Sequence, residues 1–383
     1  MAYLRLLLLS AAASFGLVWA WVAAAPMAFM EPEYASWRAK QLMLERCDIG
    51  EAIILGDSRA AAGILPGRLP FKAANLAVGG GEAIEAYAAL RRALSCPSPP
   101  RLAILSFDPG HFVRPDAVWD RSVRFGLLSA EDVATLRGAS IALGDLSVYD
   151  AHHAGGLPSV LRDELYRLRF PAFYFASLTH GGVFLRWPGN QARLRDALDS
   201  RGQYYFGVGQ GSDVVAVEGH LEAFRPLPIL DHYFARVLAL LDAHGIESRF
   251  VAMPVNEATW RQVDPAVPDQ FAGYLADFER RHSRFRVASE IMPHWPDRFF
   301  GDQFCHLNPA GAELFSSQLA QRLRQTTPAT PWPPPIGRDG AAGGASFRSA
   351  DRSPAGLPPH ARDVYSGDPE PPAGPADQSF SAP

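Results

Sequence analysis

Short apolar runs and amphipathic stretches alternate along residues 50–108. The first run, AIIL at 52–55, is ended by a glycine, and FKAANLAV at 71–78 is ended by three. Apolar positions then follow helical spacing from Glu82, before RLAILSF at 101–107 returns to a strand pattern. Because these runs are continuously apolar rather than alternating, they predict a parallel sheet covered by helices on both faces.

The same alternation returns near the end of the folded part. An amphipathic stretch ends at Gly245, a residue type that terminates helices, and the buried-strand pattern SRFVAMPV follows at 248–255. A last helix is expected over 309–324, with Asn308 as its N-cap and Pro309 at its first position. The sequence thus predicts an α/β protein.

The chain divides into three parts. Residues 1–30 hold an apolar leader, and residues 45–325 the predicted α/β domain with an insertion at about 112–230, where the alternation is lost. The tail, 326–383, is rich in proline and glycine and has scarcely any aliphatic run. Such a composition buries too little apolar surface to fold, so the tail is predicted to be disordered.

The leader determines the compartment. Residues 6–25 carry no charge and are long enough to cross a bilayer as a helix. A basic residue before them and small residues at Ala23 and Ala25 are also typical of a cleaved signal peptide. The length of the stretch, and Pro26 directly after it, favour an uncleaved anchor. In either case the rest of the chain is predicted to be exported.

Charge and cysteine content narrow the function. Lys and Arg number 36 against 40 for Asp and Glu, so the chain has no net positive charge that would attract nucleic acid. Cys47, Cys96 and Cys305 lack metal-ligand spacing, and no metal site is predicted. Cys47 and Cys96 each precede a predicted strand by a few residues, so a bridge between them is geometrically reasonable, with two buried free thiols as the alternative.

Candidate chemistry follows the predicted strands, because ligands of open parallel sheets bind beyond the carboxyl ends of the strands. Ser58, after the first strand, can present its hydroxyl there with its N–H at a helix start; the alternative is that Asp57 and Ser58 merely cap a helix. The glycine loop 75–81 can turn N–H groups toward an oxyanion, or can be a plain turn. It lacks the pattern of a nucleotide-binding loop.

The third place is the loop before the last helix. Asp302 precedes His306 by four positions, so the carboxylate can hold the imidazole tautomer while the other ring nitrogen faces a serine. A lone histidine in such a loop is more often a packed or capping residue. The joint occurrence of the three places, in this order, is what indicates a serine hydrolase.

These blocks resemble the SGNH/GDSL hydrolase superfamily. The resemblance is carried by GDS at 56–58, by N-x-x-x-x-G at Asn75 and Gly80, and by D-x-x-x-H-L-N-P-x-G from Asp302 to Gly311. It implies a three-layer α/β/α fold whose central parallel sheet has the flavodoxin-like strand order. The amino-terminal anchor, the long insertion and the HLNPAG ending are similar to exported proteins of polysaccharide O-acetylation systems, such as alginate acetylation.

The resemblance implies a role for each matching residue. Ser58 is expected to be the nucleophile, His306 the general base and Asp302 the residue that orients it, with the N–H groups of Ser58 and Gly80 as the oxyanion hole. Further site neighbours are expected at Asp57, Asn75, Gly79 and Asp108. No cofactor is implied.

Two positions depart from the family pattern. The spacing from Asp302 to His306 is one residue longer than usual, so either the loop holds an extra residue or Asp297 or a backbone carbonyl is the orienting group. The third strand runs into Asp108, where the family has an asparagine that donates to the oxyanion. An ionised carboxylate aimed there would oppose catalysis, so Asp108 points elsewhere or the hole uses backbone donors alone. An inactive member is the remaining alternative.

The expected function is extracytoplasmic transfer of an acyl group, most simply acetyl, through acyl-Ser58 to or from a cell-surface polysaccharide. The alternatives are a carbohydrate esterase of the same fold and a catalytically silent factor for polysaccharide binding or assembly. The resemblance implies an integral membrane O-acyltransferase as donor partner. It also implies a location at the inner membrane facing the periplasm, or in the periplasm after secretion.

Other candidate residues are weaker indications of a functional site. His152 and His153 lie in a polar loop, where solvated side chains are the default. The aromatic run 204–206 can stack on sugar rings or belong to the core or a lid. Cys305 is expected to point away from the site because its neighbour His306 points into it.

Overall fold

The computed structural model describes residues 2–28, 30–115, 118–150 and 186–326. The predicted disordered tail beyond residue 326 lies outside this part, as do His152 and His153.

A five-stranded parallel sheet forms the centre of the fold, in the order β2-β1-β3-β4-β6. Counted along the chain this is order 2-1-3-4-5, that of flavodoxin-like sheets, and the predicted α/β class with a central parallel sheet is confirmed. A second sheet pairs two short parallel strands. The strands are β1 (Ala52–Gly56), β2 (Ala73–Asn75), β3 (Leu102–Ser106), β4 (Glu247–Phe250), β5 (Val255–Asn256), β6 (Phe285–Val287) and β7 (His294–Trp295).

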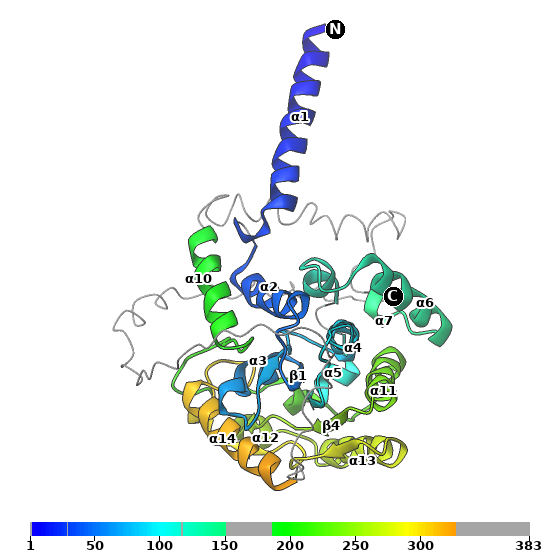
Figure 1. Cartoon of the computed structure of the whole chain (residues 1–383), viewed down its shortest axis with the longest axis vertical. Helices are drawn as coiled ribbons and strands as arrows, with labels where there is room; N and C mark the ends of the chain where they lie inside the picture. Colours follow the sequence, from blue (N-terminus) through cyan, green and yellow to red (C-terminus); the bar gives the residue numbers. More distant parts are fainter. Residues whose placement is uncertain (1, 29, 116–117, 151–185, 327–383) are drawn as a thin grey trace, which may run out of the picture. The chain divides into compact units, whose positions relative to one another are not determined.

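Helices cover both faces of the sheet, which is the arrangement of a three-layer α/β/α fold (Figure 1). The longer ones are α1 (Ala2–Ala24), α2 (Pro32–Glu45), α4 (Ala83–Leu94), α6 (Ala130–Leu143), α10 (Arg186–Asp199), α11 (Pro228–Ala243), α13 (Ala266–Arg281) and α14 (Pro309–Thr326). The short helices are α3 (Ser58–Gly63), α5 (Gly110–Val113), α7 (Ser147–Asp150) and α12 (Glu257–Trp260). Single 3₁₀ turns are η1 (Pro26–Ala28), η2 (Pro66–Arg68), η4 (Val217–His220) and η5 (Asp297–Phe299), and η3 (Val118–Val123) is a short π-helix.

Alternate side chains along a central strand pack on opposite faces of the sheet, as β1 shows. Ile53 and Leu55 belong to the apolar cluster that includes α4, α11 and α13. Ala52 and Ile54 belong to a second cluster, with α3 and α14. This is why the run at 52–55 is apolar throughout: every position of β1 is buried, one on each side in turn.

The predicted caps of the last helix and of α11 are found. Pro309 begins α14, and the Asn308 side chain accepts the Gly311 N–H at 3.0 Å. Gly245 has φ +67°, the left-handed conformation that ends α11. Between β3 and β4, the described residues 107–115, 118–150 and 186–246 contain no strand.

The chain directly after α1 is packed into the domain. Met27 and Met30 are buried in a cluster with Trp37 of α2 and with Phe125. The side-chain amide of Asn190 in α10 donates to the carbonyls of Met27 and Met30, at 3.1 and 2.9 Å. The start of α2 is therefore fixed in place within a few residues of the end of α1.

Helix α1 is the one helix of the described chain that is long and apolar enough to cross a membrane. Its segment Ala2–Trp21 has a mean hydropathy of 1.6, and none of it is buried in the protein. A signal anchor and a signal peptide both fit this helix.

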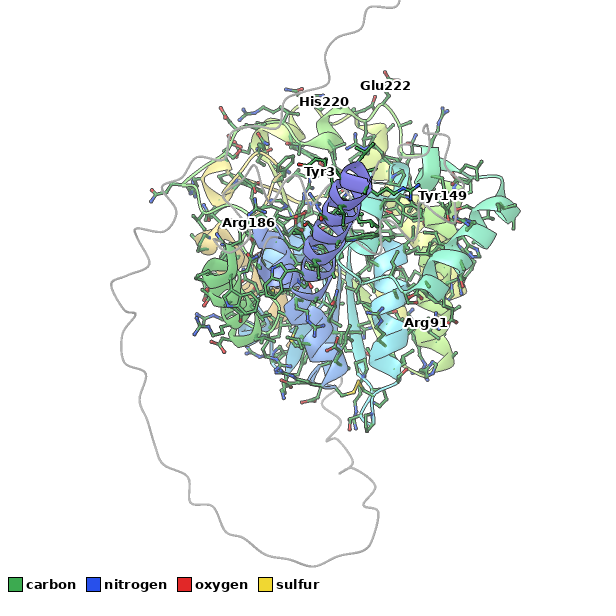
Figure 2. All side chains as sticks on the ribbon, turned by 90° about the horizontal axis from the view of Figure 1, so that it is seen from above. Tyr3, Arg91, Tyr149, Arg186, His220 and Glu222 are labelled. Carbon is green, nitrogen blue, oxygen red and sulfur yellow. A yellow bond between two sulfur atoms is a disulfide. The ribbon has the colours of Figure 1, made fainter. Side chains whose placement is uncertain are left out.

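Cys47 and Cys96 form a disulfide (Figure 2, yellow bond). Cys47 lies just beyond the end of α2 and Cys96 just beyond the end of α4, with their Cα atoms 5.5 Å apart. Of the two alternatives open from the sequence, the structure has the bridge. Disulfides persist in oxidising compartments, which agrees with an exported domain.

Candidate active site

A cavity of about 520 Å³ lies beyond the carboxyl ends of β1 and β3. Six of the eight residues that the sequence places at or near a site line it. They come from four separate stretches of the chain and are Ser58, Gly79, Gly80, Asp108, Asp302 and His306. Asp57 and Asn75 do not line the cavity, and both have structural bonds described below.

Ser58 is the first residue of α3, immediately beyond the end of β1. Asp57 caps this helix: its Oδ1 accepts the N–H groups of Arg59 and Ala60 at 2.9 and 3.2 Å. The N–H of Ser58 is thus one of the donors that a helix start leaves without an intrahelical partner. Asp57 therefore caps the helix, while Ser58 is half-buried at the cavity wall.

His306 is held by Asp302 through one ring nitrogen. Nδ1 of His306 lies 2.5 Å from Oδ2 of Asp302, and the His306 side chain is 5% exposed. The other nitrogen, Nε2, is buried and has no hydrogen-bond partner among the described residues. Ser58 and His306 are thus not hydrogen-bonded to each other here, as is common in unliganded sites, but they share one cavity.

The charge of Asp302 suits this arrangement. Burial alone would raise the pKa of Asp302, but the hydrogen bond and charge of His306, together with the N–H groups of Phe304 and His306, outweigh burial and lower the pKa. In the neutral imidazole, an ionised Asp302 that accepts from Nδ1–H selects the tautomer in which Nε2 carries no proton, which is the form that a general base requires.

The longer spacing between Asp302 and His306 is accommodated by backbone conformation. Cys305 has φ +59°, a left-handed conformation that is uncommon for residues other than glycine. Gly301 N–H donates to the His306 carbonyl at 2.8 Å and closes the loop, while Asp297 instead accepts the Ala258 N–H at 3.3 Å. Of the alternatives left open by the sequence, the geometry has Asp302 beside the imidazole.

An aromatic ring covers the imidazole. Phe206 stacks on His306 with ring centroids 4.5 Å apart and planes inclined by 25°. The aromatic run at 204–206 thus contributes one of its rings directly to the cavity wall. Stacking and the Asp302 bond together restrict the orientation of the His306 ring.

The glycine loop is held against the end of β1 and against α2. Gly81 N–H donates to the Val78 carbonyl at 3.0 Å, with Gly80 in the left-handed conformation at φ +60°. A Cβ at Gly79 would overlap the carboxylate of Glu33, which also lines the cavity. The loop therefore needs glycine for close approach as well as for its turn.

Asn75 stabilises α3 rather than the cavity. Fully buried, it donates from its amide to the carbonyls of Ala60 and Ile64, both at 2.9 Å, and accepts the Ala77 N–H at 3.1 Å. These bonds hold the short helix that carries Ser58. Its contribution to the site is made through the backbone that it supports.

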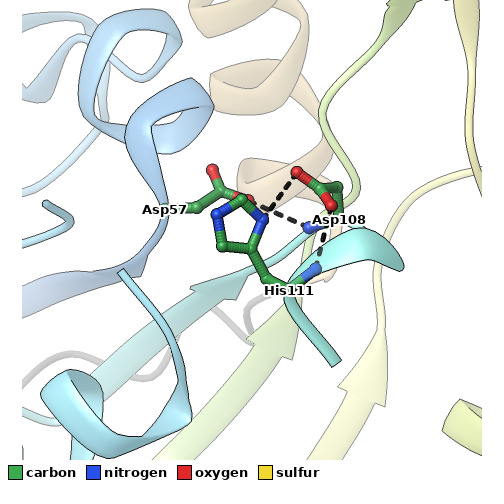
Figure 3. A group of neighbouring side chains, drawn as sticks. All are labelled: Asp57, Asp108 and His111. Carbon is green, nitrogen blue, oxygen red and sulfur yellow. Dashed lines mark hydrogen bonds and ion pairs between the residues drawn. The ribbon is translucent and has the colours of Figure 1, made fainter. Parts of the chain in front are cut away.

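Asp108 faces a histidine that the sequence analysis did not single out. Its Oδ2 lies 2.8 Å from Nδ1 of His111, and its Oδ1 accepts the His111 N–H at 3.2 Å (Figure 3). The backbone N–H of Asp108 in turn donates to Oδ2 of Asp57 at 2.9 Å, joining the ends of β3 and β1. Both carboxylate oxygens of Asp108 therefore interact with nitrogen atoms of His111.

Two buried residues complete this group. Arg59 of α3 donates to Glu218 of η4 at 2.8 Å, and its Nε lies 3.8 Å from Oδ2 of Asp108. Burial and the charge of Asp108 together raise the pKa of Glu218 to about 7, although the charge of Arg59 opposes them. Burial would also raise the pKa of Asp108, but His111 and Arg59 outweigh burial and lower it strongly.

His111 provides a positive charge beside the carboxylates of Asp108 and Asp57. Burial alone would lower its pKa, but Asp108 and Asp57 raise the pKa of His111 to about 10. The imidazole is therefore an imidazolium at neutral pH, and its side chain, 14% exposed, lines the cavity.

Asp57, Asp108 and His111 have ligand atoms within 4.8 Å of one another, a grouping that can hold a metal ion in other proteins. Here Arg59 and the His111 imidazolium already neutralise the carboxylates, and both oxygens of Asp57 accept backbone N–H groups. The arrangement is that of an internal ion-pair network, which does not need a cation.

Comparison with known proteins gives no assignment. A scan of the chain against models of protein families finds no match, and a search of curated proteins finds none. The chemistry of this cavity is therefore inferred from its own residues and geometry.

Proposed function

We propose that this chain is an extracytoplasmic serine-dependent acyltransferase that carries an acyl group, in the simplest case acetyl, on Ser58. The observation that carries the proposal is the state of His306: Nδ1 is held by Asp302, the buried Nε2 has no partner among the described residues, and His306 lines the same cavity as Ser58. A ring held in this way is suited to accept the proton of a serine hydroxyl.

The reaction would proceed in two halves. Ser58 Oγ attacks the acyl carbonyl carbon, its proton passes to His306 Nε2, and the negative charge develops on the carbonyl oxygen near the N–H groups of Ser58 and Gly80. Collapse expels the donor alcohol, which takes the proton from His306. An acceptor hydroxyl then attacks acyl-Ser58 by the same steps in reverse.

The resemblance to SGNH/GDSL proteins of polysaccharide O-acetylation supports a cell-surface polysaccharide as the acyl acceptor or source. It also supports an integral membrane O-acyltransferase as the donor, because acyl-coenzyme A is a cytoplasmic compound. An apolar helix at the amino end agrees with work at a membrane or beyond it.

The test is to treat the full chain, purified in detergent, with p-nitrophenyl acetate and to locate the adduct by mass spectrometry. We expect one acetyl group on the peptide that contains Ser58 and none in a Ser58→Ala variant that unfolds at the same temperature. Transfer of acetyl to added oligosaccharide supports a transferase, and release of acetate alone indicates an esterase. A wild-type protein without an adduct contradicts the proposal and favours a silent binding factor.

Removing the ring that covers His306 should slow acylation modestly. Phe206→Ala removes the stacked ring but keeps the Asp302 bond to the imidazole, and an aromatic pair is worth about 0.5–1.5 kcal/mol, so the rate constant for acylation should fall about 2- to 13-fold. The measurement is the burst of p-nitrophenol. Tyr205→Ala, which removes a neighbouring ring that does not line the cavity, is the matched control and should keep the wild-type burst.

A further inference from the structure

We propose that His111 is a third oxyanion donor, whose imidazolium Nε2–H supplements the backbone N–H groups of Ser58 and Gly80. This inference rests on the proposed function and adds a catalytic residue to it. No motif in the sequence marks His111, which lies in the short helix α5 directly after β3.

Position supports this role. His111 lines the same cavity as Ser58, Gly80 and His306. Its ring lies beside Asp57, the residue before Ser58, with 3.6 Å between His111 Nδ1 and Asp57 Oδ2. The strands β1 and β3 are adjacent, so the residues that follow them, Asp57 and Asp108 with the cationic ring of His111, lie together at the edge of the cavity.

The ring is fixed in an orientation that leaves one donor for a ligand. Nδ1 faces Asp108 at 2.8 Å, and the second nitrogen lies on the side of the ring away from Asp108 (Figure 3). No described residue accepts a hydrogen bond from that nitrogen. Because Asp108 holds Nδ1, the donor does not have to reorganise when charge develops on the substrate, which is the condition for effective electrostatic stabilisation.

The electrostatic surroundings keep the donor charged. Asp57 and Asp108 stabilise the imidazolium most, and Glu82 acts in the same direction. A hydrogen bond from a charged donor is about twice as strong as one between neutral groups. The titratable groups that face His111 come from α3 and the turn before it, from the end of β3 and from α4; they are Asp57, Arg59, Asp108, Glu82 and Glu85.

The step balances without transfer of the His111 proton. When Ser58 Oγ bonds to the acyl carbon, the π electrons of the carbonyl move to its oxygen, and the serine proton moves to His306. His111 donates a hydrogen bond to that oxygen and withdraws it when the C=O bond forms again. This also explains how Asp108 is compatible with catalysis, because its negative charge is directed to His111 and not to the oxyanion.

The experiment measures the rate at which an alkyl fluorophosphonate labels Ser58 of the full-length protein, since its phosphoryl oxygen takes the oxyanion position. His111→Gln should label on the order of 100-fold more slowly, with concentration dependence nearly unchanged. The wild-type rate should fall as pH rises through about 10, where His111 loses its proton, and this decline should be absent in His111→Gln. His220→Gln, which removes an exposed histidine outside the cavity, is the matched control.

A second measurement uses the wild-type protein, so it does not depend on correct folding of the variant. The imidazole NMR signals of His111 should shift when Ser58 is phosphonylated, because Nε2–H then has an acceptor. If wild-type Ser58 is labelled while His111→Gln is labelled at the same rate, or the His111 signals stay unchanged, the inference is wrong and the proposed function stands. If wild-type Ser58 is not labelled at all, both are overturned.

Discussion

An Asp302→Asn variant should acylate Ser58 about 10⁴-fold more slowly than the wild-type protein, while keeping its fold. The amide of asparagine can donate to Nδ1 of His306, which moves the ring proton to Nε2. In that tautomer Nε2 cannot accept the proton of Ser58, although every distance in the site is preserved. The measurement is the rate of acetyl-Ser58 formation with p-nitrophenyl acetate, followed by mass spectrometry at neutral pH.

Asp297→Asn is the matched control for this exchange. Asp297 lies nearby in sequence, and its carboxylate accepts the Ala258 N–H outside the cavity. It should therefore keep acylation close to the wild-type rate. The opposite pattern, with Asp302→Asn active and Asp297→Asn inactive, would show that Asp297 orients the imidazole and that the bond at 2.5 Å to Asp302 has no catalytic part.

Replacing both bridged cysteines should lower the free energy of unfolding by about 4 kcal/mol. The disulfide joins residues 49 positions apart, so it removes much of the freedom of the unfolded chain. The Cys47→Ala/Cys96→Ala protein should therefore unfold at a lower urea concentration than the oxidised wild type. Urea unfolding followed by tryptophan fluorescence measures the difference, provided that refolding is reversible.

A reductant provides the internal control. It should shift the unfolding midpoint of the wild type down to that of the double variant, and it should leave the double variant unchanged. Equal midpoints of the oxidised wild type and the variant would mean that the bridge does not stabilise the domain. A shift of both proteins by reductant would place the effect elsewhere, for example at the buried Cys305.

Local patterns were sufficient to predict the sheet and the three places that meet at the cavity. The run at 52–55, the cap at Asn308 and the pair Asp302–His306 each depend on residues close together in the chain, so their spacing carries the information. The parallel arrangement then brings Ser58 and His306 to the same edge of the sheet. Strand order followed from the resemblance, and the observed order agrees with it.

The remaining residues of the site could not be found in this way. Glu33 lies in a helix before the predicted domain and His111 in one turn of helix, neither with a neighbouring motif. Phe206 belongs to the aromatic run at 204–206, but the run does not indicate which ring meets the site. Their roles arise only from contacts between segments far apart in sequence, such as Phe206 with His306. Conversely, Asn75 belongs to a motif that predicts a site residue, but its side chain forms hydrogen bonds to backbone groups in and around α3 and does not line the cavity.

The buried start of α2 limits how far the reaction can take place from a lipid surface. Nine positions separate the last residue of α1, Ala24, from Glu33 at the cavity wall. Even a fully extended tether of that length reaches only about 30 Å. If the proposed function is correct, a molecule that keeps its anchor acylates only within a thin layer beside the bilayer. A growing glycan would then have to pass through that layer to be modified, whereas a cleaved molecule could follow the glycan outward.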